Sequence, residues 1–290
     1  MALKFAKKAA TVRSMKKIFT VRIADNGKNL LDFLAAQLNL SRRKAKEIID
    51  SRNVLVNRRR VWMAKHALEK NDIVEILNFK ADTPVPSDIR ILYQDDEFLV
   101  ADKPAGMLSN DEDSVESKLQ QKLNNPELQA VHRLDRDTSG CLLLAKTQAA
   151  FRDMIELFKK KSVKKTYHVI AAGHIEKDEQ TITFKIDDEH AVTKLRRLDG
   201  NNKATHLIAM IETGRTHQIR KHLDMINHPV LGDRQYGMRF GVANFADEIP
   251  RQMLHSYSIE FRSPSSAKHI VIKAPLPDDF RGCLGRLHLT

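Results

Sequence analysis

Hydrophobic residues in the first part of the chain recur at the spacing of two helices and a few short strands. Leucines three and four positions apart predict a helix over 28–38, and Ser41 is a suitable N-cap for a second helix over 41–51. Alternating valines predict a strand over 53–57, and a similar run predicts another over 71–76. Two helices packed on a few strands make a compact module.

The pattern changes at 80–89, where two prolines and no apolar period predict a linker. The preceding module is expected over 20–79, and a larger domain over 90–290. Strands in runs, with helices between only some of them, predict an α+β fold with a mixed, largely antiparallel sheet flanked by helices. The strands are expected at 90–94, 97–104, 165–173, 181–186, 191–198, 205–212, 254–264 and 268–275, and the helices at 149–161 and 216–226.

The positive charge of the chain is concentrated at its start. Residues 1–80 hold 19 Lys and Arg against 7 Asp and Glu, a difference of +12, which equals the net charge of the whole chain. Clustered cations of this kind are typical of a protein that binds a polyanion such as RNA. Residues 1–19, which contain no acid, are expected to form a basic arm that touches RNA; a solubility tail is the alternative.

Several classes of protein are disfavoured by missing motifs. The sequence contains no phosphate-binding GxxxxGK[ST] loop, no GxGxxG, no HExxH and no GxSxG. The two cysteines are far apart, and His217 and His222 are five positions apart, which does not place them on one helix face as metal ligands. No apolar run approaches the ~20 residues of a membrane helix. We therefore expect no metal, no nucleotide cofactor and no membrane partner.

One short segment, VHRLDRDTSG at 131–140, is unusual in its charges. Asp135 lies between Arg133 and Arg136, which are expected to favour its ionised form, although Asp135 could instead cap an ordinary turn. Tyr167 lies in KKTYHV and Arg220 in TGRTHQIR, each at a predicted end of a strand or start of a helix. A carboxylate, an aromatic ring and a guanidinium brought together from separate elements suit an enzyme that acts on a flipped nucleotide.

The order of these segments resembles the RluA class of RNA pseudouridine synthases, which isomerise uridine in structured RNA. The similar stretches run from about 90 to 265. They are ILYQDDEFLVADKPAGM, VHRLDRDTSG, GCLLLAKT, KKTYHVIAAG, TGRTHQIRKHL, HPVLGDRQYG and MLHSYSIEF.

The resemblance implies a role for each matching residue. Asp135 is then the catalytic aspartate, Tyr167 stacks on the uracil and is a candidate to take the C5 proton, and Arg220 pairs with Asp135. Arg133 is expected to enter the RNA stack where the uridine has left, with Arg136 beside it on the RNA, and Leu254 to pack on the pocket floor. The reaction is an isomerisation, so it needs no cofactor.

The first module resembles an S4-type RNA-binding domain, in which basic side chains contact RNA. The expected contacts are Arg42, Arg43, Lys46, Arg58, Arg59 and Arg60. Arg58 departs from the S4 pattern, which often has glycine there, so the turn could differ.

The S4-type module favours large-subunit ribosomal RNA over transfer RNA as the substrate of the expected enzyme. The two distant cysteines fit a reducing compartment, so a cytoplasmic protein is expected, and a monomer is the default expectation. An organellar presequence is the alternative for the basic start of the chain. Two alternatives remain for the function. The first is a non-catalytic RNA-binding or ribosome-assembly factor, and the second is a hydrolase that uses Asp135 and His217.

Overall fold

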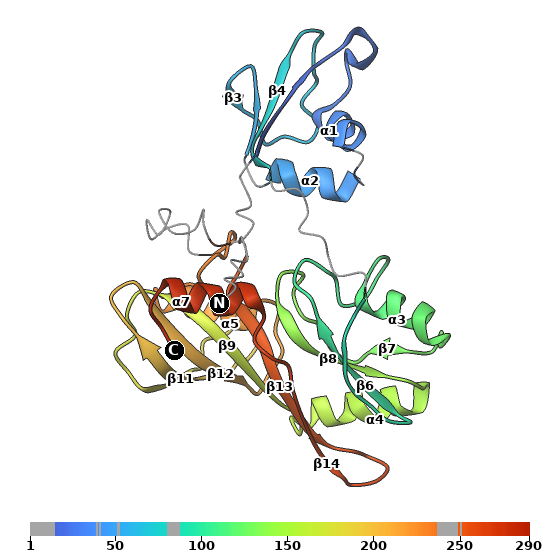
Figure 1. The fold of residues 1–290 in the computed structure, drawn as a ribbon, viewed down its shortest axis with the longest axis vertical. Helices are drawn as coiled ribbons and strands as arrows, with labels where there is room; N and C mark the ends of the chain where they lie inside the picture. The colour runs from blue at the N-terminus through green and yellow to red at the C-terminus, as the bar shows by residue number, and fades with distance from the viewer. Residues whose placement is uncertain are drawn as a thin grey trace, which may run out of the picture. The chain divides into compact units, whose positions relative to one another are not determined.

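The computed structural model describes residues 15–38, 40, 42–50, 53–79, 88–236, 249 and 251–290, with no side chain described at 15, 43, 44, 47, 78 and 79. The chain divides into two compact units, Met1–Thr83 and Pro84–Thr290 (Figure 1). Residues 1–14 of the expected basic arm and 80–87 of the expected linker lie outside the described residues. None of the helices described is long and apolar enough to cross a membrane.

The first unit is a four-stranded antiparallel sheet with two helices. The strands, in sheet order, are β1 (Met15–Thr20), β4 (Ile73–Phe79), β2 (Val54–Val56) and β3 (Arg59–Arg60). Helices α1 (Leu30–Leu38) and α2 (Arg42–Asp50) follow a single turn of 3-10 helix, η1 (Ile23–Asp25). Strand β1 starts before residue 20, so positions 15–19 belong to this sheet although the sequence assigned them to the arm.

The apolar periodicity of the sequence becomes the core of this unit. Phe33 and Leu34 of α1, Ala45 and Ile49 of α2, and Val54 of β2 are fully buried in one cluster. The spacing of these residues places them on the inner faces of their helices and strand, which is why the pattern predicted the elements.

The turn between β2 and β3 holds Arg58 in a conformation that its side chain does not favour. Asn57 and Arg58 both have positive φ, at 51° and 65°. Two-residue hairpin turns need this left-handed geometry, for which glycine is best suited. Arg58 therefore adopts the conformation that a glycine would take, at a cost of ~1 kcal/mol.

The second unit is built on one ten-stranded mixed sheet. Its main path runs β10 (Glu179–Ile182), β11 (Thr193–Gly200), β12 (Ala204–Ile211), β9 (Lys164–Ala172), β13 (Leu254–Arg262), β8 (Ser139–Ala145), β6 (Phe98–Lys103) and β5 (Ile91–Gln94). Strand β14 (His269–Lys273) pairs with β13, and β7 (Gln129–Ala130) pairs with β8. The β13–β8 pair is parallel and every other pairing is antiparallel, which confirms the expected mixed sheet.

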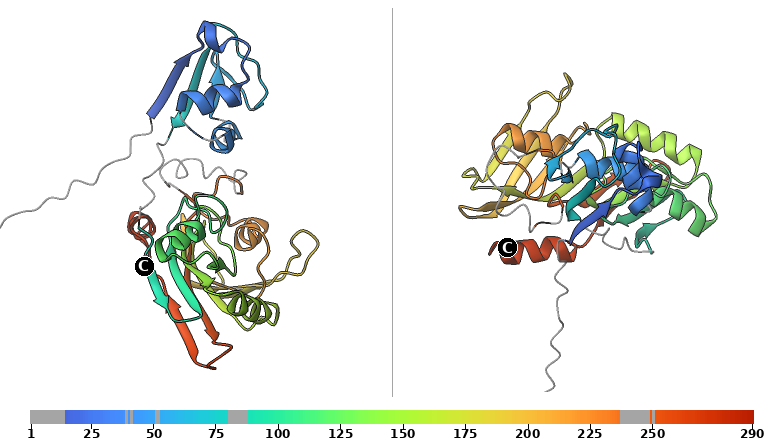
Figure 2. Two further views of the ribbon diagram at one scale, coloured as in Figure 1. Left: turned by 90° about the vertical axis from the view of Figure 1, so that its right-hand side faces the viewer. Right: turned by 90° about the horizontal axis from the view of Figure 1, so that it is seen from above.

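Helices cover both faces of the sheet (Figure 2). Alternate residues of β6, β8 and β9 point to one cluster that includes α3 (Val115–Leu123) and α5 (Gln218–Met225). The intervening residues of these strands point to clusters that include α4 (Gln148–Lys159) and α7 (Asp278–Arg286). The central strands are therefore buried on both sides, which explains their nearly continuous apolar sequence.

One expected strand ends earlier than its sequence suggested. The pattern predicted a strand over 181–186, whereas β10 is Glu179–Ile182. Its neighbour β11 begins at Thr193, which pairs with Ile182, so no partner backbone continues beyond that point. Phe184, just past the end of β10, is 53% exposed. Alternation along a sequence cannot show where the neighbouring strand stops.

Candidate active site

Asp135 lies on the loop 131–138, hereafter the Asp135 loop, which connects β7 to β8. A turn closes it, because the Thr138 amide donates to the Asp135 carbonyl at 3.0 Å. Ser109 fixes the loop before the turn, since its Oγ accepts from the Leu134 amide at 2.9 Å and donates to the Leu134 carbonyl at 3.0 Å. Both backbone groups of the residue before Asp135 are therefore satisfied by one buried hydroxyl.

The end of the loop passes very close to the neighbouring strand. Gly140 has φ of 109°, and a Cβ built on it would lie 2.1 Å from the Ser256 carbonyl oxygen. The two residues pair in the parallel β13–β8 ladder. Only glycine fits this approach, so the pairing of β8 with β13 requires Gly140.

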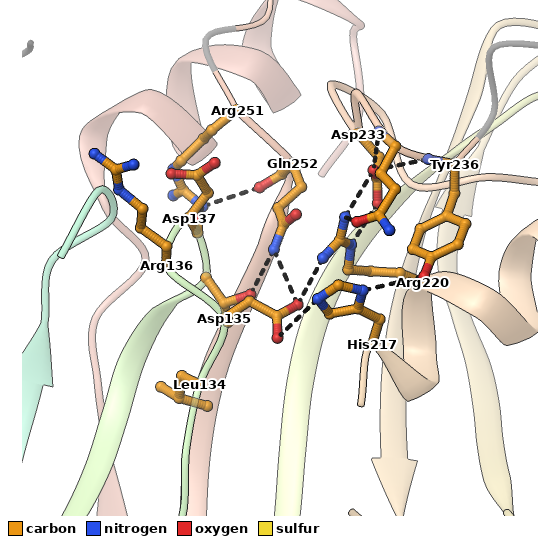
Figure 3. Close-up of polar contacts among 12 residues, drawn as sticks. Leu134, Asp135, Arg136, Asp137, His217, Arg220, Asp233, Tyr236, Arg251 and Gln252 are labelled. Atoms are coloured by element: carbon orange, nitrogen blue, oxygen red, sulfur yellow. Dashed lines mark hydrogen bonds and ion pairs between the residues drawn. The ribbon is translucent and has the colours of Figure 1, made fainter. Parts of the chain in front are cut away.

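The carboxylate of Asp135 faces α5 rather than its neighbours in sequence (Figure 3). Arg220 donates from Nη1 to Asp135 Oδ2 at 2.9 Å. The Asp135 side chain is 27% exposed and that of Arg220 only 7%, so a reactant can approach the carboxylate while the guanidinium is shielded. A charge-assisted bond of this kind fixes the orientation of the carboxylate.

Arg220 is itself held by a buried carboxylate. Its Nε and Nη2 donate to the two oxygens of Asp233 at 2.6 and 2.9 Å, and the Asp233 side chain is fully buried. Its guanidinium also lies 5.0 Å from the ring centre of Tyr236. Hydrogen bonds to Asp233 and Asp135, together with their charges, raise the pKa of Arg220 in spite of desolvation, which is the largest single effect and acts in the opposite direction. The guanidinium is a fixed positive charge beneath Asp135.

His217, the residue before α5, approaches Asp135 from the same side. Its Nε2 lies 3.8 Å from Asp135 Oδ1, and its Nδ1 lies 3.1 Å from the Tyr236 hydroxyl. Burial lowers the pKa of His217, while the charge of Asp135 acts in the opposite direction. This favours a neutral ring that shapes the site. The other histidine of this segment, His222, is buried against Thr193 and the Phe184 carbonyl, so the two do not form a pair of ligands.

Two consecutive residues before β13 complete the support of the loop. Gln252 donates from Nε2 to Thr138 Oγ1 at 2.8 Å and to Asp135 Oδ2 at 3.4 Å. Arg251 forms two bonds to Asp279 of α7, at 2.6 and 3.0 Å. Its remaining donors bond the Ser139 hydroxyl and the carbonyls of Asp137, Gln252 and Leu254. The Asp135 loop, β13 and α7 are thus joined by one buried guanidinium.

A buried lysine ties the turn after β6 to the same loop. Lys103 is fully buried, and its Nζ donates to the carbonyls of Pro104, Met107 and Arg136 at 3.0, 2.6 and 2.8 Å. Desolvation lowers the pKa of Lys103 to about 7, with Asp137 and Asp135 acting against that change and Arg251 and Arg136 adding to it.

Lys103 should make the stability of the second unit depend on pH. Its pKa is 10.5 when unfolded and about 7 when folded, so between these values unfolding takes up a proton. The free energy of unfolding should therefore rise with pH in that window, by up to ~1.4 kcal/mol per pH unit, and fall back as pH drops towards 7. Urea unfolding of the wild type and Lys103→Met at several pH values measures this. Equal pH slopes for the two proteins would contradict the prediction.

Tyr167 of β9 lies in the apolar cluster beside the loop and is 5% exposed. Desolvation raises its pKa, a hydrogen bond with Ser256 acts against this, and the charge of Asp135 adds to it. The phenol is therefore protonated at neutral pH. Leu254, at the start of β13, is 4% exposed in the same cluster, as are Met107 and Leu134. The cluster gives the site an apolar wall.

The two arginines beside Asp135 in sequence are placed differently. Arg133 is exposed, and no ion pair links it to another described residue. Arg136 points away from the Asp135 carboxylate (Figure 3), and its Nε donates to the Gly106 carbonyl at 3.0 Å. The guanidinium bonded to the Asp135 carboxylate is therefore that of Arg220, and not that of either neighbour in sequence.

The basic residues expected to contact RNA in the first unit fall into two groups. Arg42 and Lys46 on α2 pair with Asp32 and Asp50, at 2.9 and 2.7 Å. The second group, Arg58, Arg59 and Arg60, is exposed at the β2–β3 turn. The side chain of Arg43 lies outside the described residues.

Sequence reasoning missed several residues of this site. Asp233 and Tyr236 are in the quoted GDRQYG segment but received no role, and Gln252, Arg251 and Asp279 carried no signal of their own. Within the described part of the chain, no group of three or more His, Cys, Asp or Glu side chains could hold a metal ion. The arrangement offers instead an accessible carboxylate, a fixed guanidinium and an apolar wall with a phenol.

Known proteins share this arrangement of segments. The family model described as RNA pseudouridylate synthase matches residues 97–225, which include the Asp135 loop, β9 and α5. Ribosomal large subunit pseudouridine synthase C of Vibrio cholerae is 31% identical and aligns with 86% of this chain and 90% of its own. Ribosomal large subunit pseudouridine synthase D of Pseudomonas aeruginosa is also 31% identical, over 69% of this chain and 72% of its own.

Solved structures agree on the fold of the second unit. The human RNA pseudouridylate synthase domain containing 4 protein superposes with a TM-score of 0.59 at 23% identity, over 69% of this chain and 93% of that one. The likeness in fold and the identity to relatives over most of both chains point the same way. The chain belongs to the RNA pseudouridylate synthase family.

Proposed function

We propose that this pseudouridine synthase acts on uridine in large-subunit ribosomal RNA, with Asp135 as its catalytic aspartate. The observation that carries the catalytic assignment is the 2.9 Å contact that fixes the accessible Asp135 carboxylate on the buried guanidinium of Arg220. The substrate follows the relatives from Vibrio cholerae and Pseudomonas aeruginosa, whose names specify the large ribosomal subunit.

The reaction breaks the C1′–N1 glycosidic bond and forms a C1′–C5 bond, so the proton lost from C5 balances the one gained at N1. Two routes begin with the carboxylate, either attack on the sugar to give a covalent ester or removal of the C2′ proton to give a glycal. Both need an ionised, oriented Asp135. Arg220 supplies that orientation, and Gln252 holds the same oxygen from the other side.

Tyr167 is proposed to stack on the uracil and to act through its hydroxyl. Since burial keeps the phenol protonated, it enters the reaction as a donor, and it can accept the C5 proton only after losing its own. Tyr167→Phe keeps the ring and removes the hydroxyl, so pseudouridine formation should fall by about 10²-fold with RNA binding retained. Single-turnover rates on a short RNA measure this. A Phe variant as fast as the wild type would limit Tyr167 to stacking.

The first unit is proposed to be an S4-type RNA-binding domain that supplies phosphate contacts, while the second unit supplies the pocket. Phosphate contacts give affinity and orientation but little sequence reading. Because an unpaired base is more easily unstacked, the target uridine should lie in a loop or junction.

The proposed substrate is tested by mapping pseudouridine in cells that lack the gene and in the parent strain. At least one site in large-subunit ribosomal RNA should be unmodified in the deletion strain, and the purified protein should modify the same site in a transcript. Loss of a site in transfer RNA alone would contradict the substrate. Failure of the protein to modify any RNA would favour a role as a binding or assembly factor.

A further inference from the structure

Among the side chains described in the first unit, the most exposed aromatic one is that of Trp62, which follows β3. Trp62 is 59% exposed and the next residue, Met63, is 60% exposed. It is also the single tryptophan of the whole chain. Scattered apolar residues on a surface are common, but an indole ring is a large apolar area to leave in water.

The local backbone explains why this ring points outward. Val61 and Ala64, which flank the Trp62–Met63 pair, pack against the core of the unit. The Val61 amide donates to the Val54 carbonyl at 3.0 Å, and the Leu31 amide donates to the Ala64 carbonyl at 3.1 Å. The segment is thus fixed at both ends to β2 and α1. Trp62 is held outward on an anchored segment.

The basic side chains around Trp62 differ from other cations of the same unit. Arg58, Arg59, Arg60 and Lys65 are exposed, no acid occurs from position 53 to 68, and no ion pair joins these four to any residue described. By contrast, four other cations of this unit have carboxylate partners within 3 Å. These pairs are Lys16–Glu75, Lys28–Asp25, Arg42–Asp32 and Lys46–Asp50. Among the residues described, the four cations next to Trp62 therefore lack the carboxylate partners that those other four have.

The turn at the tip of this segment supports a binding role. Arg58 keeps a left-handed conformation, with φ of 65°, where glycine would be unstrained. Strained positions persist where the surrounding structure fixes them, and they are frequent at binding sites. Arg58 is therefore held exposed at the tip of the hairpin.

We propose that residues 58–65, hereafter the Trp62 segment, bind single-stranded RNA, with an unpaired nucleobase stacked on Trp62 and phosphates on the arginines. The inference rests on the proposed function, since it identifies where the substrate RNA meets the first unit. Single-strand binding commonly combines a basic track with an aromatic ring, because every base offers a face for stacking. The proposal places the main RNA contact of the first unit at the β2–β3 turn instead of α2, where Arg42 and Lys46 are paired with carboxylates.

A membrane surface is the other partner that a tryptophan among cations would fit. Membrane-bound segments of this kind are usually amphipathic helices with an extended apolar face. The Trp62 segment is a turn, a two-residue strand and a loop, and its apolar exposure is confined to Trp62 and Met63. The geometry suits one base and its flanking phosphates better than a lipid surface.

The single tryptophan makes the proposal directly measurable. Titration of the full chain with a single-stranded RNA containing the target loop should quench Trp62 fluorescence along the binding curve, and a fully paired duplex should do so much less. Trp62→Ala should weaken binding about tenfold, and Trp62→Phe should retain most of the affinity because it keeps a ring for stacking. RNA binding without a change in Trp62 fluorescence, or with the same affinity for the Ala variant, would overturn the proposal.

The arginines are tested by the dependence of affinity on salt. Replacing Arg58, Arg59 and Arg60 with Gln should reduce the slope of log K against log salt by about 2, at ~0.7 per phosphate contact on a single strand. The matched comparison is Arg42→Gln with Lys46→Gln, which removes two locally paired cations and should change the slope less. An equal or larger loss of slope in the α2 variant would assign the contact to α2 and overturn the placement.

Two further measurements separate this proposal from the proposed function. The Trp62 titration is repeated with Asp135→Asn protein, whose fluorescence response should match that of the wild type whether or not the chain isomerises uridine. Quenching by RNA together with no pseudouridine would remove the catalytic assignment and leave the Trp62 segment in place. Quenching by anionic phospholipid vesicles, but not by RNA, would overturn the Trp62 proposal in favour of a lipid partner.

Discussion

Asp135→Asn should reduce pseudouridine formation by at least ~10³-fold while leaving RNA binding nearly intact. The amide has the shape of the carboxylate and can still meet Arg220, which now donates 2.9 Å from Oδ2. An amide is neither a nucleophile towards the sugar nor a base for its C2′ proton, so both routes lose their first step. Single-turnover assays measure the chemical step separately from binding when the enzyme is in excess of the RNA and its concentration is above the dissociation constant.

The same loop offers a matched control. Asp137 is two positions from Asp135 and exposed, and no hydrogen bond or ion pair of its carboxylate is found among the residues described. Asp137→Asn removes the same charge without touching Arg220, and it should keep most of the activity. Full activity in the Asp135 variant would contradict the catalytic assignment. Release of free uracil or cleaved RNA by the wild type would indicate a hydrolase instead.

Arg220→Met should destabilise the second unit by ~3–5 kcal/mol, in addition to abolishing activity. The arginine forms both short bonds to Asp233, whose side chain is fully buried. Removing the guanidinium leaves a buried carboxylate without its counter-charge, which costs far more than the loss of one hydrogen bond. Urea unfolding followed by circular dichroism measures the change, because a single tryptophan in the first unit does not report on the second.

A second substitution tests the cause of that loss. Asp233→Asn in the Arg220→Met background removes the stranded charge and should restore part of the stability, but it should not restore activity, because Asp135 still lacks its partner. Arg220→Lys keeps a charge but cannot make the two parallel bonds to Asp233, so it should lie between the wild type and Met in stability. If the double variant is less stable than Arg220→Met, the buried charge is not the source of the destabilisation.

The sequence was a good guide to strands that alternate and are buried. The predictions at 165–173 and 205–212 agree to within a residue with β9, Lys164–Ala172, and β12, Ala204–Ile211. Helices α3 and α7 were missed for two different reasons. In α3 the capping partner at N3 is Ser117 instead of the usual Glu or Gln, and in α7 two glycines lower the helix propensity. Both helices owe their stability to packing on the sheet, which local pattern does not show.

The site was only partly predictable. The family resemblance paired Asp135 with Arg220, and the structure places these two in contact. Local charge, however, pointed to Arg133 and Arg136. Arg133 forms no ion pair with any residue described, and Arg136 bonds the Gly106 carbonyl instead. Gln252 and Arg251 reach the loop from more than a hundred positions away, and nothing in their own segment marks them. These contacts form because β13 pairs with β8 in the sheet, and the order of strands in a sheet is not visible in a single sequence.

The contacts of the Arg251 guanidinium join segments that are far apart in the chain, and this affects the order in which the enzyme folds. It bonds Asp279 across 28 positions and the Asp137 carbonyl across 114, while Arg220 reaches Asp135 across 85. Contacts so distant along a chain form late, because the intervening loops must first be closed. An intermediate that has collapsed but not yet docked α7 would hold the reactive carboxylate out of alignment. Pulse-labelling hydrogen exchange during refolding should find the amides of the Asp135 loop among the last to gain protection.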